Sequence, residues 1–143
     1  MAVADVPSHD EVIRRHGRPW VLVADDSHAM RDVLHEVLDA AGYEVTTVAS
    51  GARALEAMSN RIPDLVITDL LMPGMSGFSL RAAMLRRSDL AAVPVIVLSG
   101  YWQRPGETLE AAEVITKPIS IDRLLESVRR LAAPSAPPPS DAP

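Results

Sequence analysis

Five short apolar runs, separated by stretches with helical spacing and by turns, constrain the fold of this sequence more than any other feature. Short apolar runs bounded by turn signals are typical of strands that are buried on both faces. We predict strands over 20–24, 44–48, 64–69, 93–98 and 113–116. Strands that alternate with helices form a parallel sheet covered by helices on both faces, with right-handed crossovers. The sequence therefore predicts an α/β, doubly wound fold.

The segments between these runs carry the signals of helices. Met30, Val33, Leu34 and Leu38 recur on one face at helical spacing, so we expect all four side chains to face the core. Serine, a preferred N-cap residue, precedes two of the helical segments. The predicted helices run up to Gly42, from Ser50 to Asn60, over 77–87, over 107–112 and from Ser120 to Leu131.

Length and composition fit a single globular domain. The chain has 143 residues, of which 48% are hydrophobic and 23% charged, as in ordinary globular proteins. Residues 19–132 hold every segment that can pack. Residues 1–18 lack periodicity and predict a flexible arm, with a short helix over 10–16 as the alternative. Residues 133–143 are rich in proline, alanine and serine, which predicts a disordered tail.

Charge and cysteine content exclude several classes of protein. The formal net charge of −5 does not favour a nucleic-acid surface. The chain has no cysteine, which excludes disulfides and thiolate metal sites and suits a reducing compartment. The N-terminus lacks the pattern of a signal peptide, and no apolar run approaches the roughly 20 residues that span a bilayer. We expect a cytoplasmic protein with no direct nucleic-acid or membrane partner.

Polar side chains stand where four of the predicted strands end. Asp25 and Asp26 follow the first strand, Asp69 ends the third, Ser99 follows the fourth and Lys117 follows the fifth. Each residue alone is ordinary, since an acid there is often an N-cap and a serine often a turn residue. The carboxyl ends of parallel strands, however, meet at one edge of the sheet, where ligands bind in open α/β folds. The joint placement therefore predicts a site.

The three carboxylates of this set determine its chemistry. At about 5 Å and an effective dielectric near 20, each carboxylate pair costs about 3 kcal/mol, so a cation must compensate. Mg²⁺ suits such oxygen ligands because it keeps waters and binds through one or two carboxylates plus a phosphate. A metal, a lysine ammonium and a hydroxyl around a carboxylate suit phosphoryl transfer. An already ionised carboxylate nucleophile would then form an aspartyl phosphate.

Four motifs carry a resemblance to a known family. They are VLVADDS at 21–27, VITDLLMPGMSG at 66–77, VIVLSG at 95–100 and ITKPIS at 115–120. On these motifs, residues 20–131 resemble the receiver domain of two-component response regulators. The resemblance implies a flavodoxin-like (βα)5 fold with strand order 2-1-3-4-5, whose switch point lies between strands one and three.

The resemblance also implies roles for individual residues. It implies that Asp69 is the phosphoacceptor, and that Asp26, Asp69 and the backbone carbonyl of Leu71 bind Mg²⁺ directly. It implies that Asp25 acts through a coordinated water.

On the phosphoryl side, the resemblance implies that Ser99 turns toward the phosphoryl group. It implies that Lys117 holds a phosphoryl oxygen and is joined to Pro118 by a cis bond. The implied donor is a phosphohistidine on a sensor histidine kinase or phosphotransfer protein, or a small acyl phosphate. Such a domain is a phosphoacceptor that catalyses its own phosphorylation and dephosphorylation, rather than an enzyme with another substrate.

Two departures from the family pattern concern the output of the domain. The family usually has an aromatic residue at the switch position three residues before the lysine, where this chain has Val114. A valine cannot make the same rotamer change as Ser99 moves. The segment between Ser99 and Lys117 is also shorter than usual and is interrupted by Pro105 and Gly106. We therefore expect a short or displaced fourth helix and an altered output face.

Several functions fit this pattern. Because no output domain follows residue 132, we predict a stand-alone receiver that signals through phosphorylation-dependent protein–protein interaction. The alternatives are a receiver fragment of a longer regulator and a phosphate-independent binding module. A phosphohydrolase with an aspartate nucleophile fits less well, because such enzymes typically carry two acids spaced by one residue after the first strand.

Overall fold

The computed structural model describes residues 17–100 and 113–132 of the chain. Its five strands are β1 (Trp20–Ala24), β2 (Glu44–Val48), β3 (Leu65–Asp69), β4 (Val95–Ser99) and β5 (Glu113–Thr116). They form one parallel sheet in the order β2-β1-β3-β4-β5. This order and the parallel pairing confirm the predicted flavodoxin-like fold. β4 begins two residues later than predicted, after Pro94, whose carbonyl accepts a hydrogen bond from β3.

Four helices connect or follow these strands. They are α2 (His28–Ala40), α3 (Gly51–Ala57), α4 (Gly77–Leu85) and α5 (Ile121–Leu131). A serine caps each of them, because its hydroxyl accepts a hydrogen bond from a backbone N–H of the first turn. The predicted helix over 107–112, most of the N-terminal arm and the tail over 133–143 lie outside the described residues.

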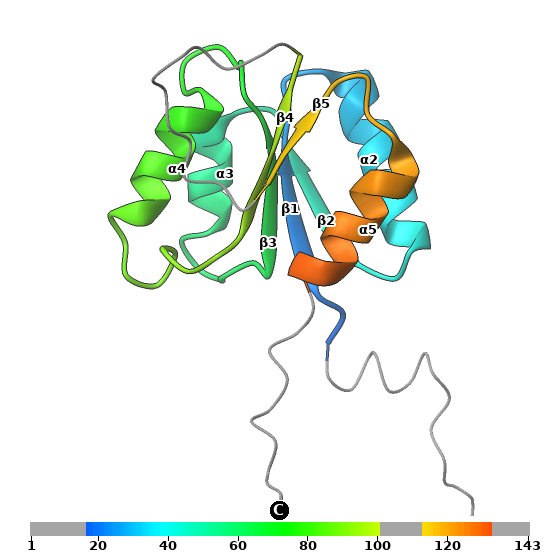
Figure 1. Ribbon diagram of the computed structural model, residues 1–143. Coiled ribbons are helices and arrows are strands. Elements are labelled where there is room, and N and C mark those ends of the chain that lie inside the picture. The colour runs from blue at the N-terminus through cyan, green and yellow to red at the C-terminus, as the bar shows by residue number, and fades with distance from the viewer. Residues whose placement is uncertain (1–16, 101–112, 133–143) are drawn as a thin grey trace, which may run out of the picture.

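The helices cover the sheet in two layers, α3 and α4 on one face and α2 and α5 on the other (Figure 1). Side chains along each strand alternate between the two cores. Leu22 of β1 packs in the cluster beneath α3 and α4, whereas Val21 and Val23 pack in the cluster beneath α2 and α5. β1, β3 and β4 are buried along their whole length, as expected for a parallel sheet between two helical layers.

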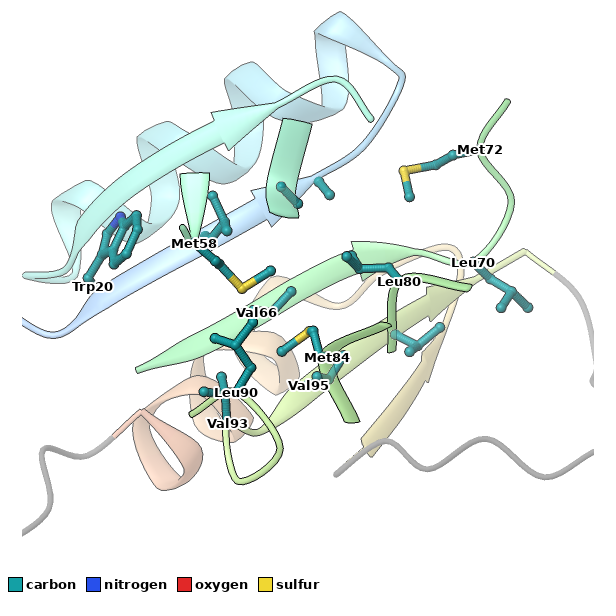
Figure 2. Packing of buried hydrophobic residues seen from close by; sticks show 14 residues of the cluster. Trp20, Met58, Val66, Leu70, Met72, Leu80, Met84, Leu90, Val93 and Val95 are labelled. Carbon is teal, nitrogen blue, oxygen red and sulfur yellow. The ribbon is translucent and has the colours of Figure 1, made fainter. Parts of the chain in front are cut away.

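The cluster beneath α3 and α4 extends over the full length of the sheet. Figure 2 shows Trp20 at one end of it and Met72 at the other, with Met58 and Met84 near Val66 between them. Burying side chains of this size contributes about 1.5–3 kcal/mol each. The cluster therefore holds the segment after β3, which includes Met72, against the sheet.

The prediction that the Val33 side chain faces the core was wrong. The side chain of Val33 is 45% exposed, although its spacing places it beside Leu34 and Leu38, which are fully buried. Val33 borders an open groove between α2 and the start of α5 instead of packing against another element.

None of the helices in the described part of the chain is long and apolar enough to cross a membrane.

Candidate functional site

The carboxyl ends of the strands, at the top of Figure 1, gather the predicted polar side chains. Oxygen atoms from the carboxylates of Asp25, Asp26 and Asp69 lie within 4.8 Å of one another. The Lys117 ammonium lies 3.1 Å from Oδ1 of Asp69. Two of the carboxylates belong to the loop after β1, one ends β3 and the lysine follows β5. These strand ends lie near one another because β1 and β3 are neighbours in the sheet and β5 is two strands from β3.

Three hydrogen bonds hold Asp25 in place in the loop between β1 and α2. The Asp25 backbone N–H donates to the Val48 carbonyl at the end of β2 (3.0 Å), and Oδ1 accepts from the Ser27 N–H (2.9 Å). The Arg31 guanidinium donates to the Asp25 carbonyl (2.8 Å). The contacts of Arg31 and Val48 were not predicted, because no local pattern marks a side chain or carbonyl that supports a neighbouring loop.

The carboxylate of Asp25 is only partly satisfied. Asp25 is 1% exposed, and its Oδ2 atom is buried with no hydrogen-bond partner among the described residues. Burial raises the pKa of Asp25 above its ordinary value, the hydrogen bond from Ser27 lowers it, and the nearby charge of Asp69 raises it again. An unpaired buried oxygen is costly, so this atom is the strongest indication that the site takes a cation.

Asp69 lies deeper in the site than Asp26. It is 8% exposed, while Asp26 is exposed. Its backbone carbonyl accepts a hydrogen bond from the Thr68 hydroxyl (2.9 Å). The loop that follows closes tightly, since the Gly77 N–H donates to the Leu70 carbonyl (2.8 Å). These two hydrogen bonds hold the backbone on which the Asp69 carboxylate is carried.

Ser99 and Lys117 lie on neighbouring strand ends. The Lys117 N–H donates to the Ser99 carbonyl (2.7 Å), and Ser99 is 4% exposed. The peptide bond between Lys117 and Pro118 is cis. Val114 is partly buried and packs against the cluster beneath α3 and α4. Leu71 lies two residues beyond β3 with a 52% exposed side chain.

The residues present fit a divalent cation. Three carboxylates so close together repel one another by about 3 kcal/mol per pair at an effective dielectric near 20, and the ammonium contact found among the described residues lies on Asp69. Carboxylate oxygens with room for waters are the ligands that Mg²⁺ prefers. The unpaired Oδ2 of Asp25 would gain a partner from a metal-bound water.

An apolar groove lies beside this site, between the start of α2 and the segment that joins β5 to α5. Its volume is about 360 Å³. The lining side chains are mostly apolar and include Ala29, Met30, Val33, Pro118, Ile119 and Ile121. Lys117 also lines it, so the groove opens directly onto the polar site.

Comparison with known proteins identifies the family. The model of the response regulator receiver domain matches residues 21–129. Among curated proteins, the chain is 34% identical to the C4-dicarboxylate transport transcriptional regulatory protein DctD of Rhizobium meliloti over 117 residues, which cover 78% of this chain and 25% of DctD. It is 43% identical over 82 residues to the two-component response regulator ORR3 of Oryza sativa subsp. indica, covering 57% of this chain and 63% of ORR3. The chain thus spans a quarter of the length of DctD and less than two thirds of ORR3.

Solved structures agree with this assignment. Chemotaxis protein CheY4 of Vibrio cholerae superposes with a TM-score of 0.74 at 31% identity, covering 80% of this chain and 99% of CheY4. The receiver domain of a signal transduction histidine kinase from Syntrophus aciditrophicus gives a TM-score of 0.77 at 30% identity, covering 87% of this chain and 98% of that domain. The chain therefore belongs to the CheY-like response regulator receiver domains of two-component signalling, a family of phosphoacceptors that bind Mg²⁺ at an acidic pocket and interact with histidine kinases or phosphotransfer proteins.

Proposed function

We propose that this chain is a receiver domain that is phosphorylated on Asp69 in a Mg²⁺-dependent reaction. The observation that carries the proposal is the arrangement around Asp69. Its carboxylate contacts the Lys117 ammonium at 3.1 Å and shares a cluster of oxygen atoms with Asp25 and Asp26. Among the clusters that the described residues form, this one combines a buried acid with both a cation partner and a candidate metal site.

The proposed reaction is a phosphoryl transfer to a carboxylate. An oxygen of Asp69 forms a bond to the phosphorus of a phosphohistidine, and the phosphorus–nitrogen bond of the donor breaks. The donor imidazole leaves with the bonding electron pair and takes a proton from solvent. With an acyl phosphate as donor, a phosphorus–oxygen bond breaks and a carboxylate leaves instead. A carboxylate nucleophile has no proton to lose when it attacks, so the step needs no separate base.

The chain's own residues position and neutralise the groups that react. Asp26, Asp69 and the Leu71 carbonyl would hold Mg²⁺, with Asp25 acting through a coordinated water. Bound Mg²⁺ supplies positive charge that offsets the carboxylates and the phosphoryl oxygens. Lys117 lies where it can transfer its contact from the Asp69 carboxylate to a phosphoryl oxygen.

Ser99 is the remaining residue that we expect to respond to the phosphoryl group. It ends β4 next to Lys117, and we propose that its hydroxyl donates a hydrogen bond to the phosphoryl group. A phosphoryl group adds about 1.5 to 2 negative charges at neutral pH, which draws hydroxyl and ammonium groups inward. Such a change shifts a balance between two conformations of the domain.

The apolar groove beside Lys117 is the proposed contact for a protein donor. A sensor histidine kinase or phosphotransfer protein must bring its phosphohistidine to Asp69, and the groove presents exposed apolar side chains, including Val33, next to the polar site. Exposed apolar patches rimmed by polar residues mark protein contacts. We expect Val33→Asp to slow transfer from a phosphorylated kinase that serves the native chain. Phosphorylation by acetyl phosphate, which needs no docking, should proceed at the native rate.

The residue at the switch position bears on the output of the domain. Val114 packs against the cluster beneath α3 and α4 and is too small to repeat the aromatic switch expected in this family. We propose that the signal passes through phosphorylation-dependent binding of another protein to a single domain over 19–132. A longer regulator is the second candidate, because the chain spans only a quarter of its relative DctD.

Intact mass spectrometry tests this function. The native chain and Asp69→Asn are incubated with acetyl phosphate or phosphoramidate, with and without Mg²⁺. We expect one added phosphoryl group that requires both Mg²⁺ and Asp69. Asp39→Asn, which alters an exposed acid of α2 remote from the cluster, is the matched control and should behave as the native chain does. Folded native protein that gains no mass under any condition would point to a phosphate-independent module.

A further inference from the structure

The turn between β2 and α3, residues 48–51, touches both halves of the acidic site. On one side, the Val48 carbonyl accepts a hydrogen bond from the Asp25 N–H (3.0 Å). On the other side, Gly51 packs against Met75, which belongs to the loop between β3 and α4. The same short turn therefore contacts the loop that carries the acid pair and the loop that follows Asp69.

The contact between Gly51 and Met75 leaves no room for a side chain at position 51. A methyl group at Gly51 would lie 2.9 Å from both Cγ and Sδ of Met75 and 3.1 Å from its Cβ. A new rotamer can move Cγ and Sδ. The backbone fixes Cβ, so full relief of the contact requires a shift of the Met75 backbone. Because packed interiors transmit such shifts, we expect a methyl group at Gly51 to displace the loop by a few tenths of an ångström.

The loop after Asp69 is braced so that a shift of Met75 reaches its other end. The Met75 N–H donates to the Pro73 carbonyl (3.1 Å), and the Gly77 N–H donates to the Leu70 carbonyl (2.8 Å). Met75 also packs against the core cluster that contains Leu70 and Met72. Leu71 lies within this closed segment, so its carbonyl moves when the segment moves.

We propose that the β2–α3 turn sets the spacing between the two halves of the metal site. In this inference, which rests on the proposed function, Gly51 and Met75 are positioning residues. Val48 fixes the acid pair through its hydrogen bond with the Asp25 backbone. The packing contact between Met75 and Gly51 fixes the loop that carries the Leu71 carbonyl. The steric fit at Gly51 thereby determines how well Mg²⁺ is held.

Calorimetric titration with Mg²⁺ tests this inference in the absence of any phosphodonor. The proteins compared are the native chain, Gly51→Ala, Met75→Ala and the double variant. We expect Gly51→Ala to weaken Mg²⁺ binding roughly tenfold, as loss of a supporting contact does at metal sites. The double variant should bind Mg²⁺ more tightly than Gly51→Ala, because shortening Met75 removes the clash. Such coupling is what a double-mutant cycle measures.

Thermal unfolding without Mg²⁺ separates positioning from general stability. Ala52→Gly, at the next and exposed position of α3, is the control. It should lower the melting temperature through helix propensity and leave the Mg²⁺ affinity unchanged. Should Gly51→Ala fail to fold, Met75→Ile crowds the same contact from the other side and is expected to weaken Mg²⁺ binding.

The possible failures are distinguishable. A native chain that binds no Mg²⁺ would overturn the proposed function and this inference together. Native binding with an equal affinity in Gly51→Ala would overturn the inference alone. A loss in Gly51→Ala that persists unchanged in the double variant would also overturn it, because the cause would then lie in the Gly51 backbone rather than in the contact with Met75.

Discussion

The Lys117 ammonium lies 3.1 Å from Oδ1 of Asp69 and thus occupies the space beside the carboxylate where other cations would be attracted. The lysine side chain is 29% exposed and the aspartate side chain 12%, so the pair is partly shielded from water. A contact of this kind both neutralises the acid and competes with a metal for it. Removing the ammonium should therefore have two effects of opposite sign.

We expect Lys117→Met to tighten Mg²⁺ binding and to slow phosphorylation. The metal binds more tightly because a competing positive charge is gone. Phosphorylation by phosphoramidate slows by about tenfold or more, because a donor to the developing phosphoryl charge is lost. Calorimetry gives the Mg²⁺ affinity and intact mass gives the rate. A variant in which the Mg²⁺ affinity and the phosphorylation rate both rise, or both fall, would contradict this role of Lys117.

We expect Asp25→Asn to stabilise the metal-free protein by about 1–3 kcal/mol, because a buried and only partly hydrogen-bonded carboxylate is replaced by a neutral amide. Burial raises the pKa of Asp25, so the folded state binds a proton more readily than the unfolded state does. The native chain therefore loses stability as the pH rises through that raised pKa, and Asp25→Asn lacks this loss. Urea unfolding with chelator, from pH 4 to pH 8, measures the difference; Asp39→Asn is the control.

Asp25→Asn should also remove most of the stabilisation that Mg²⁺ gives the native protein. A ligand stabilises the folded state more when its affinity for that state is higher, and the variant has one carboxylate fewer near the metal. A variant that is less stable than the native chain without metal would show that burial of the Asp25 charge does not destabilise the fold.

We expect Gly77→Ala to destabilise the fold by about 1–3 kcal/mol, the usual range for overpacking. A methyl group at Gly77 would lie 2.8 Å from the Asp69 carbonyl oxygen and 3.1 Å from the Leu70 Cα. Both are backbone atoms, so no side-chain rotation relieves the contact. Gly100→Ala is the matched control, because a methyl group there meets nothing within 4 Å. Equal midpoints of urea unfolding for the two variants would contradict this prediction.

We expect Glu113→Gln to lower the free energy of unfolding at pH 7 by about 1–2 kcal/mol, as for a hydrogen-bonded charge. The Ser127 hydroxyl donates to Glu113 (2.7 Å), and Arg130 does so at 2.6 Å. The hydrogen bond from Ser127, supported by Arg130 and Arg123, holds the pKa of Glu113 below its ordinary value. The ionised Glu113 side chain therefore contributes its full stabilisation above the pKa that Glu113 has in the unfolded chain. This stabilisation is lost as the pH falls through the lower pKa that Glu113 has in the folded state.

The measurement for Glu113 is urea unfolding of both proteins between pH 3 and pH 7. The difference between native chain and variant should shrink toward low pH. Glu126→Gln, an exposed acid on α5, the helix that carries Ser127 and Arg130, is the control and should change stability by no more than about 0.5 kcal/mol at any pH. A constant difference for Glu113→Gln across this range would show that its charge is not what stabilises the contact.

The strands and the gathering of polar residues could be predicted from the sequence, because both follow from local patterns. A buried parallel strand is a continuous apolar run, and the residue that ends it must lie at the edge of the sheet. This is why the structure brings Asp25 and Asp69 together with Lys117 as expected.

Contacts between distant segments could not be predicted in the same way. Two examples are the packing contact between Met75 and Gly51 and the hydrogen bond from Arg130 to Glu113. Both depend on how helices pack, and neither leaves a local signal in the sequence. Helical spacing likewise gives the face on which Val33 lies but not whether another element covers it. Its exposure follows from the open groove beside α5.

The strand order gives the two partners in the central ion pair different freedom to move. Asp69 ends β3, which is hydrogen-bonded to a neighbour on each side, whereas Lys117 follows β5, the edge strand, which is bonded to β4. Shifting the end of β3 would disturb two ladders and the centre of both cores. Shifting the end of β5 disturbs one. When the charge between these two residues changes, we therefore expect the lysine to move and the aspartate to keep its position in the sheet.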